Sequence, residues 1–99
     1  MRDWVVGGAL IESDQGVLLV CNRRRDGSHD WSTPGGVIDE GETMLEGLAR
    51  EVLEETGLIV TAWQGPLYEV VVHAPDMGWH LRVEAWLATE VAGEVCDGF

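Results

Sequence analysis

Residues 36–58 read GVIDEGETMLEGLAREVLEETGL, and this stretch decides the fold and the chemistry that we expect of the chain. Seven of its 23 residues are acidic and one, Arg50, is basic. Thr43 and Glu46 have the spacing of a capping box, in which each side chain accepts a hydrogen bond from the other residue's backbone N–H. Gly57 is a natural helix stop, because glycine adopts the left-handed conformation without strain. We therefore predict one helix between Thr43 and Gly57.

The predicted helix has an apolar side and an acidic side. The apolar residues recur at helical spacing, and we expect all five to face the core: Leu45, Leu48, Ala49, Val52 and Leu53. Glu51, Glu54 and Glu55 are spaced so that their carboxylates meet on one side of the helix. Like charges at that spacing weaken a helix by roughly 0.2–0.5 kcal/mol per pair. A divalent cation would offset this repulsion, since Mg²⁺ and similar hard cations prefer oxygen ligands.

Short apolar segments surround the predicted helix. We expect strands at residues 4–12, 17–22, 31–33, 58–63, 67–74 and 81–88, separated by turn-forming residues. The first two should form a hairpin, residues 34–36 should break the chain sharply, and residues 65–66 should form a turn. In the last segment apolar residues occupy every second position, which is typical of a strand. Strands around one helix indicate an α+β fold.

Size and charge restrict the functions that the chain can have. It has 99 residues, enough for one domain, and a net charge of −12 from eighteen acidic and six basic residues. This charge argues against binding a nucleic-acid polymer, which needs a basic surface. A phosphorylated small substrate would be repelled unless cations bridged it. The sequence has no apolar run of membrane-spanning length and no signal-peptide core, so we expect no membrane partner and a cytoplasmic protein.

The residues by themselves indicate hydrolysis at phosphorus. The glycine turn at Gly35 and Gly36 lets a backbone carbonyl approach the glutamates, because no Cβ lies in the way. A divalent cation held there would bridge phosphate oxygens, neutralise developing charge and lower the pKa of a bound water. A remaining carboxylate would remove the proton from that water.

The same stretch resembles the signature of the Nudix hydrolase family, G-x5-E-x7-R-E-U-x-E-E-x-G-U, where U is a bulky aliphatic residue. All nine specified positions match: Gly36, Glu42, Arg50, Glu51, Val52, Glu54, Glu55, Gly57 and Leu58. The resemblance implies a mixed β-sheet between helices, with the motif forming a loop, a helix and a loop. Such domains usually continue with another strand and a second long helix, which implies that residues 1–99 are a single Nudix domain incomplete at its C-terminus. A bare sheet face would favour self-association, such as a homodimer.

The resemblance also implies a metal site. Its ligands would be the carbonyl of Gly36 and the carboxylates of Glu51, Glu54 and Glu55, which would bind one to several Mg²⁺ or Mn²⁺ ions. Glu54 would be a principal ligand, and either Glu54 or Glu55 would be the general base.

Other matched positions would support these ligands. Arg50 would orient the glutamates through ion pairing, with Glu42 as its structural partner, and Gly57 would be structural. Many family members take a further acidic ligand from a late loop, which here would fall near Asp97 or beyond Phe99.

Two segments before the motif are candidates for substrate binding. Arg23, Arg24 and Arg25 would meet substrate phosphates if their loop lies near the motif, since arginine suits bidentate phosphate contacts. The alternative is a solvated run of charge. Trp31 would stack on a base, or else it packs in the core or on the sheet.

We therefore expect a hydrolase that cleaves the pyrophosphate bond of a nucleoside diphosphate linked to another group. The substrate would be a small nucleotide, either an oxidised nucleoside triphosphate or an ADP-ribose type of compound. One alternative is a noncatalytic module of the same fold that binds a nucleotide or a protein. Another is a fragment that is inactive alone.

Overall fold

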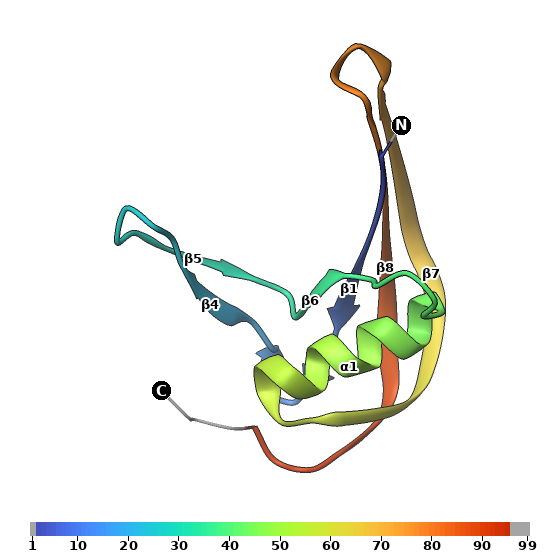
Figure 1. The fold of residues 1–99 in the computed structure, drawn as a ribbon. Helices are drawn as coiled ribbons and strands as arrows, with labels where there is room; N and C mark the ends of the chain where they lie inside the picture. The colour runs from blue at the N-terminus through green and yellow to red at the C-terminus, as the bar shows by residue number, and fades with distance from the viewer. Residues whose placement is uncertain (1, 96–99) are drawn as a thin grey trace.

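The computed structural model describes residues 2–95, in which one helix lies across a four-stranded mixed sheet (Figure 1). The strand order is β6-β1-β8-β7. The bounds are β1 (Arg2–Leu10), β6 (Gly35–Val37), β7 (Ile59–Ala74) and β8 (Trp79–Ala92). β1 is parallel to β8 and antiparallel to β6, and β7 is antiparallel to β8. The α+β fold with a mixed sheet, expected from the sequence, is confirmed.

Four short strands form two small hairpins beside this sheet. β2 (Glu12–Ser13) pairs with β3 (Gly16–Val17), and β4 (Val20–Arg23) pairs with β5 (His29–Ser32). The β4–β5 hairpin projects away from the sheet as a separate arm (Figure 1). A short 3-10 helix, η1 (Pro75–Met77), connects β7 to β8. No helix among the described residues is long and apolar enough to cross a membrane.

The predicted helix is confirmed as α1 (Met44–Thr56). The capping box is present, with Thr43 accepting from the backbone of Glu46 and Glu46 accepting from the backbone of Thr43. Gly57 ends the helix in the left-handed conformation at φ 81°. The buried stripe is narrower than expected: Leu48 and Val52 are fully buried, but Leu53 is 49% exposed. The prediction for Leu53 was wrong because the buried positions follow an i, i+4 row, and Leu53 lies about 100° around the helix from Val52.

The expected hairpin of residues 4–12 with residues 17–22 forms only beside its turn, where Glu12 pairs with Val17 and Leu18 donates to the carbonyl of Ile11 at 2.9 Å. It does not extend along β1. Both edges of β1 are hydrogen-bonded, one to β6 and the other to β8, so β1 has no free edge for residues 17–22. The first segment continues only as the short β2, and the second divides into β3 and β4.

The predicted chain break at 34–36 is instead the start of β6. Gly35 and Gly36 pair with Gly8 and Gly7 of β1. A Cβ on Gly35 would lie 2.1 Å from the carbonyl oxygen of Gly7, so the two strands approach this closely only because a glycine is present. A turn at Gly65 was wrong as well, because residues 59–74 form one strand with register shifts around that position.

The helix α1 covers one face of the four-stranded sheet, whereas the opposite face has exposed side chains. Gly7 faces α1, since a Cβ there would meet Met44 and Leu48, and its register partner Glu84 lies on the same face. On the opposite face, Tyr68 and Val70 of β7 are 59% and 47% exposed. The apolar alternation expected in β8 is therefore present, but its apolar positions lie on the face away from the helix, where Ala85 is buried and Val83 is half-buried. The expectation of self-association remains a prediction.

Candidate functional site

Arg50 lies at the centre of the predicted site and joins the helix to the loop before it. Its Nε and Nη2 donate to the two carboxylate oxygens of Glu42 at 2.8 and 2.9 Å. The backbone N–H of Asp39 also donates to Glu42, at 2.9 Å. The hydrogen bonds from Arg50, and then that from Asp39, lower the pKa of Glu42 to about 2. Glu42 is thus an ionised carboxylate that fixes one edge of the guanidinium.

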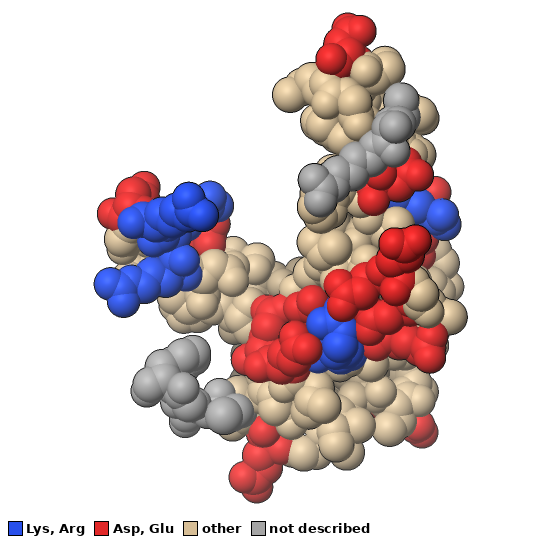
Figure 2. All heavy atoms as spheres, in the orientation of Figure 1, with Lys and Arg blue, Asp and Glu red and all other residues tan. Residues whose placement is uncertain are grey.

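The other edge of Arg50 contacts the acidic side of α1. Nη1 donates to Glu51 at 3.1 Å and to Glu54 at 3.2 Å. Nη2 also donates to the backbone carbonyl of Val37 at 3.3 Å. The acidic side chains gather over α1 around this basic group (Figure 2). One guanidinium thus holds Glu51, Glu54 and the loop in a common arrangement.

The glycines of β6 meet the same glutamates from the other side. A Cβ on Gly36 would lie 2.8 Å from the carboxylate carbon of Glu51, so only a glycine backbone leaves room for that carboxylate. The backbone N–H of Gly35 donates to Glu55 at 3.2 Å. Burial raises the pKa of Glu55, and the charges of Glu51 and Glu54 raise it further. Glu51 and Glu55 therefore meet the glycine pair, at an energetic cost that a bound cation would relieve, and Arg50 holds Glu54 beside Glu51.

The donor set fits a hard divalent cation. It consists of carboxylate and backbone oxygens, which Mg²⁺ and Mn²⁺ accept, and contains no thiol or imidazole. Within residues 2–95, no three His, Cys, Asp or Glu side chains are already arranged around a common metal position. The carboxylates of Glu51 and Glu54 instead accept hydrogen bonds from Arg50. The late ligand expected near Asp97 lies outside the described residues.

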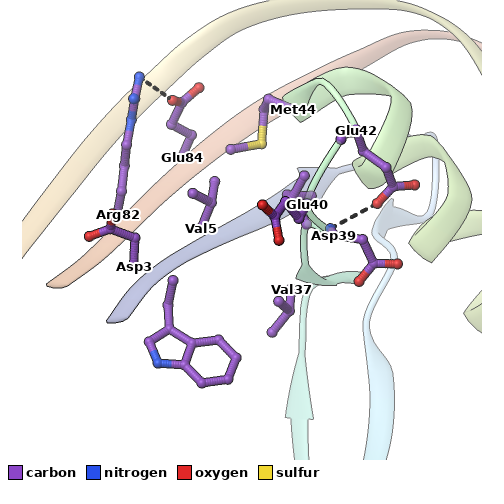
Figure 3. Close-up of a pocket in the computed structure, with 12 residues that line it drawn as sticks. Asp3, Val5, Val37, Asp39, Glu40, Glu42, Met44, Arg82 and Glu84 are labelled. Carbon is purple, nitrogen blue, oxygen red and sulfur yellow. Dashed lines mark hydrogen bonds and ion pairs between the residues drawn. The ribbon is translucent and has the colours of Figure 1, made fainter. Parts of the chain in front are cut away.

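Two hollows lie near this site. The larger, of about 880 Å³, opens between the upper part of β1 and β8 and the loop before α1 (Figure 3). Asp39 and Glu42 reach it, but Glu51, Glu54 and Glu55 do not. Apolar and acidic side chains share its wall. Its one basic group, Arg82, contacts Glu84 at 2.9 Å.

The smaller hollow, of about 270 Å³, is lined by Gly35 and Gly36, although Glu51, Glu54 and Glu55 do not line it either. Ser32 and Tyr68 line it as well. Sequence reasoning missed both residues, and nothing in their local patterns marks them, because only the pairing of distant strands brings them to the glycines.

Glu84 is another residue that the sequence did not single out. It is only 6% exposed, although it is charged. Trp86 Nε1 donates to its Oε1 at 3.0 Å, and Arg82 contacts its Oε2. These partners satisfy the hydrogen-bonding capacity of the carboxylate, which explains how Glu84 can be buried on the face of the sheet that α1 covers.

The arginines predicted to meet substrate lie on the β4–β5 hairpin. Arg24 Nε donates to Asp30 at 3.0 Å, so the charge of Arg24 is already paired within the hairpin. The basic side chains over this hairpin are set apart from the acidic side chains over α1 (Figure 2). Trp31 is 66% exposed, so packing in a core is wrong for it. Substrate binding by Arg23, Arg24 and Trp31 remains a prediction.

Comparison with protein families gives one match over nearly the whole chain. A family model described as NUDIX domain matches residues 1–95. The 8-oxo-dGDP phosphatase NUDT18 of Danio rerio is 32% identical over 90 residues, which cover 83% of this chain and 28% of that protein. Nucleoside diphosphate-linked moiety X motif 6 of Xenopus laevis is 43% identical over 53 residues, covering 54% of this chain and 24% of that protein. The chain thus spans about a quarter of the length of these curated relatives.

Solved structures share the arrangement of strands and helix. The solution structure of the E. coli ORF135 protein has a TM-score of 0.82 at 24% identity, covering 97% of this chain and 67% of that one. A MutT NUDIX hydrolase from Burkholderia pseudomallei has a TM-score of 0.74 at 28% identity, covering 97% of this chain and 74% of that one.

Proposed function

This chain belongs to the Nudix hydrolase family, and from that premise we propose that it is a Mg²⁺- or Mn²⁺-dependent hydrolase of pyrophosphate bonds. The substrate would be a nucleoside diphosphate linked to another group. The observation that carries the proposal is that Glu51 and Glu55 meet Gly36 and Gly35, with a Cβ on Gly36 only 2.8 Å from the carboxylate of Glu51. Arg50 holds Glu54 beside Glu51.

The roles follow from that arrangement. The carbonyl of Gly36 and the carboxylates of Glu51, Glu54 and Glu55 would hold the cation. When bound, the cation would bridge phosphate oxygens, neutralise their charge and acidify a water. Arg50 positions Glu51 and Glu54 through its hydrogen bonds, and Glu42 positions Arg50.

Glu54 or Glu55 would take the proton from the attacking water. As the water oxygen bonds to one phosphorus, the bridging P–O bond breaks and the bridging oxygen leaves with the other phosphoryl group. The products are two phosphorylated fragments. The raised pKa of Glu55 indicates a carboxylate that accepts a proton readily.

The name of one relative supports one of the two expected substrate subclasses. The name of the Danio rerio relative refers to an oxidised nucleotide, and that relative matches 83% of this chain. We therefore rank an oxidised nucleoside di- or triphosphate above an ADP-ribose type of substrate. A noncatalytic binding module is disfavoured, because every glutamate of the motif is present and engaged.

The test is product release from a panel of nucleoside diphosphate derivatives and oxidised nucleoside triphosphates, with Mg²⁺, with Mn²⁺ and with chelator. Glu54→Gln should abolish turnover, while Glu12→Gln, an exposed glutamate on β2, should leave it unchanged. Circular dichroism would confirm that each variant is folded. A folded parent chain that turns over no member of the panel with either metal would refute the proposal.

A further inference from the structure

The histidines of the chain lie in two different places. His29 is on the exposed β4–β5 hairpin, whereas His73 and His80 lie near the turn between β7 and β8, beyond α1 (Figure 1). His73 and His80 are register partners, so their side chains emerge on the same face of the sheet. Their rings are stacked, with centroids 4.0 Å apart and planes 23° from parallel. The strand pairing thus places two imidazoles side by side.

Asp3 of β1 holds the ring of His80. The two residues are register partners in the parallel pairing of β1 with β8, and Oδ1 of Asp3 lies 3.3 Å from Nδ1 of His80. An ionised carboxylate only accepts hydrogen bonds, so Nδ1 is the nitrogen that carries the hydrogen. In the neutral ring, the lone pair is then on Nε2. A single row across three strands therefore contains Asp3, His80 and His73.

Nε2 of His80 has no hydrogen-bond partner in the protein. It is the one buried side-chain nitrogen or oxygen among residues 2–95 in that condition. Buried polar atoms are nearly always paired, so an unpaired one requires an explanation. The side chain as a whole is 30% exposed, and the ring stacked on it belongs to His73, which is exposed. A small ligand can therefore reach Nε2 once the ring of His73 turns aside.

This arrangement matches the way in which proteins hold late transition metals. A metal-binding histidine usually donates its other ring N–H to a carboxylate, which fixes the tautomer and the orientation of the ring. Neutral imidazole is a ligand for Zn²⁺, Cu²⁺ and Ni²⁺, whereas Mg²⁺ prefers oxygen. The chemistry of the histidine pair thus differs from that of the helix glutamates, whose donor atoms are all oxygens.

One ring must turn for both histidines to bind a single ion. Zinc binds imidazole nitrogen at about 2.0–2.1 Å, so two nitrogens on one tetrahedral zinc lie about 3.3 Å apart. Centroids 4.0 Å apart place the rings near that separation, but stacked rings direct their lone pairs side by side. Rotation about the side-chain bonds of the exposed His73 would aim a nitrogen at the ion, while Asp3 holds His80. Within the described residues no three His, Cys, Asp or Glu side chains surround a common position, so water would complete the coordination.

The charges near the histidine pair favour a cation. Asp3 contributes a negative charge beside His80, in a chain of net charge −12. The nearest basic side chain along β8 is that of Arg82, which contacts Glu69 at 3.2 Å and Glu84 at 2.9 Å. Its positive charge is therefore compensated by two carboxylates.

We propose that His73 and His80 form a binding site for a late divalent transition metal such as Zn²⁺, with Asp3 as the positioning residue for His80. The site is separate from the glutamates of α1 and does not depend on the proposed hydrolysis. A bound ion would hold β7 against β8 at their turn and, through Asp3, would tie both to β1. Asp3 also lines the hollow of about 880 Å³, so the ion would fix part of its wall.

Isothermal titration calorimetry with Zn²⁺ in excess Mg²⁺ tests the site, because Mg²⁺ competes for oxygen ligands and not for imidazole. His73→Phe and His80→Phe each keep a ring in place and should weaken Zn²⁺ binding at least about tenfold. His29→Phe is the matched control, since it removes the remaining histidine from an exposed hairpin, and it should leave the affinity unchanged.

Asp3→Ala tests the positioning role. It should weaken Zn²⁺ binding by about 10- to 100-fold, the range for a carboxylate that orients a ligating histidine. Asp14→Ala removes the same charge from the exposed turn between β2 and β3, and it should leave the affinity unchanged. Equal losses for the two variants would mean that only the overall charge attracts the ion, and Asp3 would then have no positioning role.

Electron paramagnetic resonance of the Cu²⁺ form gives a second readout. The parent should show coupling to the nitrogens of two imidazoles, and His73→Phe should show coupling to one. Zn²⁺ binding that is lost in Glu54→Gln but kept in both histidine variants would place the ion at α1 and overturn the inference. Equal losses for His29→Phe and His80→Phe, or no Zn²⁺ binding by the folded parent chain, would overturn it too. Coupling to two imidazoles in a chain that hydrolyses no nucleotide would uphold this inference while the proposed hydrolysis fails.

Discussion

Replacing Gly35 by alanine should destabilise the fold strongly, although the change adds one methyl group. Gly35 has φ of 151°, a conformation that L side chains rarely adopt. Its Cβ would lie 2.1 Å from the carbonyl oxygen of Gly7 and 2.9 Å from the Cα of Gly8. Both neighbours are backbone atoms of a central strand, so neither can rotate away as a side chain would.

The size of the effect follows from two costs. Backbone strain at such a φ costs about 1–3 kcal/mol. Relieving the contact requires β6 to separate from β1, and losing two of their backbone hydrogen bonds costs about 1–3 kcal/mol more. A chain of this size has a free energy of unfolding of only about 5–15 kcal/mol. At about 4–8 °C per kcal/mol, the Tm should fall by at least about 10 °C.

Thermal unfolding followed by circular dichroism measures this effect. Gly41→Ala is the control, because Gly41 also has a positive φ, of 92°, but has no atom within 4 Å of the added Cβ. The Tm of Gly41→Ala should fall only by the amount that backbone strain at the positive φ causes. Equal decreases for the two variants would show that the close approach of β6 to β1 does not exist, and the reasoning about the glycine pair would fail.

Three further predictions concern the site and the helix. Gly36→Ala should lower kcat/KM at least about tenfold with little change in Tm, because the added Cβ displaces only the flexible carboxylate of Glu51. A fall in Tm as large as that of Gly35→Ala would contradict this prediction. The pKa of Glu42 is about 2 in the folded chain and higher in the unfolded chain. Its ion pair with Arg50 therefore stabilises the fold above about pH 4.5 and loses that effect as the pH falls toward 2. The difference in Tm between the parent and Glu42→Gln should shrink between pH 7 and pH 3. Leu48→Ala should lower the free energy of unfolding in urea by about 2–5 kcal/mol, and Leu53→Ala by less than about 1 kcal/mol. Similar decreases for the two variants would mean that Leu53 belongs to the buried side of the helix.

Much of the candidate site could be predicted because its residues lie within one helix and its flanking turns. The spacing of Glu51, Glu54 and Glu55 places them together on any helix, and the capping box fixes where that helix begins. Arg50 is one turn from Glu54, so their contact follows from the same geometry. The bond from Arg50 to Glu42 was expected from the resemblance alone, because the loop between them has no regular geometry.

Other parts of the site depend on residues distant in sequence. Glu84 alternates with apolar residues along its strand, and the fold buries it with Arg82 and Trp86 as partners. Tyr68 reaches the glycines only because β7 pairs with β8 and β8 with β1. The sequence left open whether Trp31 stacks on a base or packs in the core or on the sheet, and the β4–β5 hairpin leaves it 66% exposed.

The sequence by itself determined the family motif, the bounds of α1, the acidic character of its outer side and the α+β class. These depend on interactions between residues a few positions apart, whose geometry the helix fixes without reference to the rest of the chain. Only the tertiary structure decided that β1 lies between β6 and β8, that Gly35 and Gly36 form a strand rather than a break, and which side chains are buried. Those outcomes depend on which strand edges are already paired and how closely two backbones approach, and a local pattern of residue types contains neither quantity.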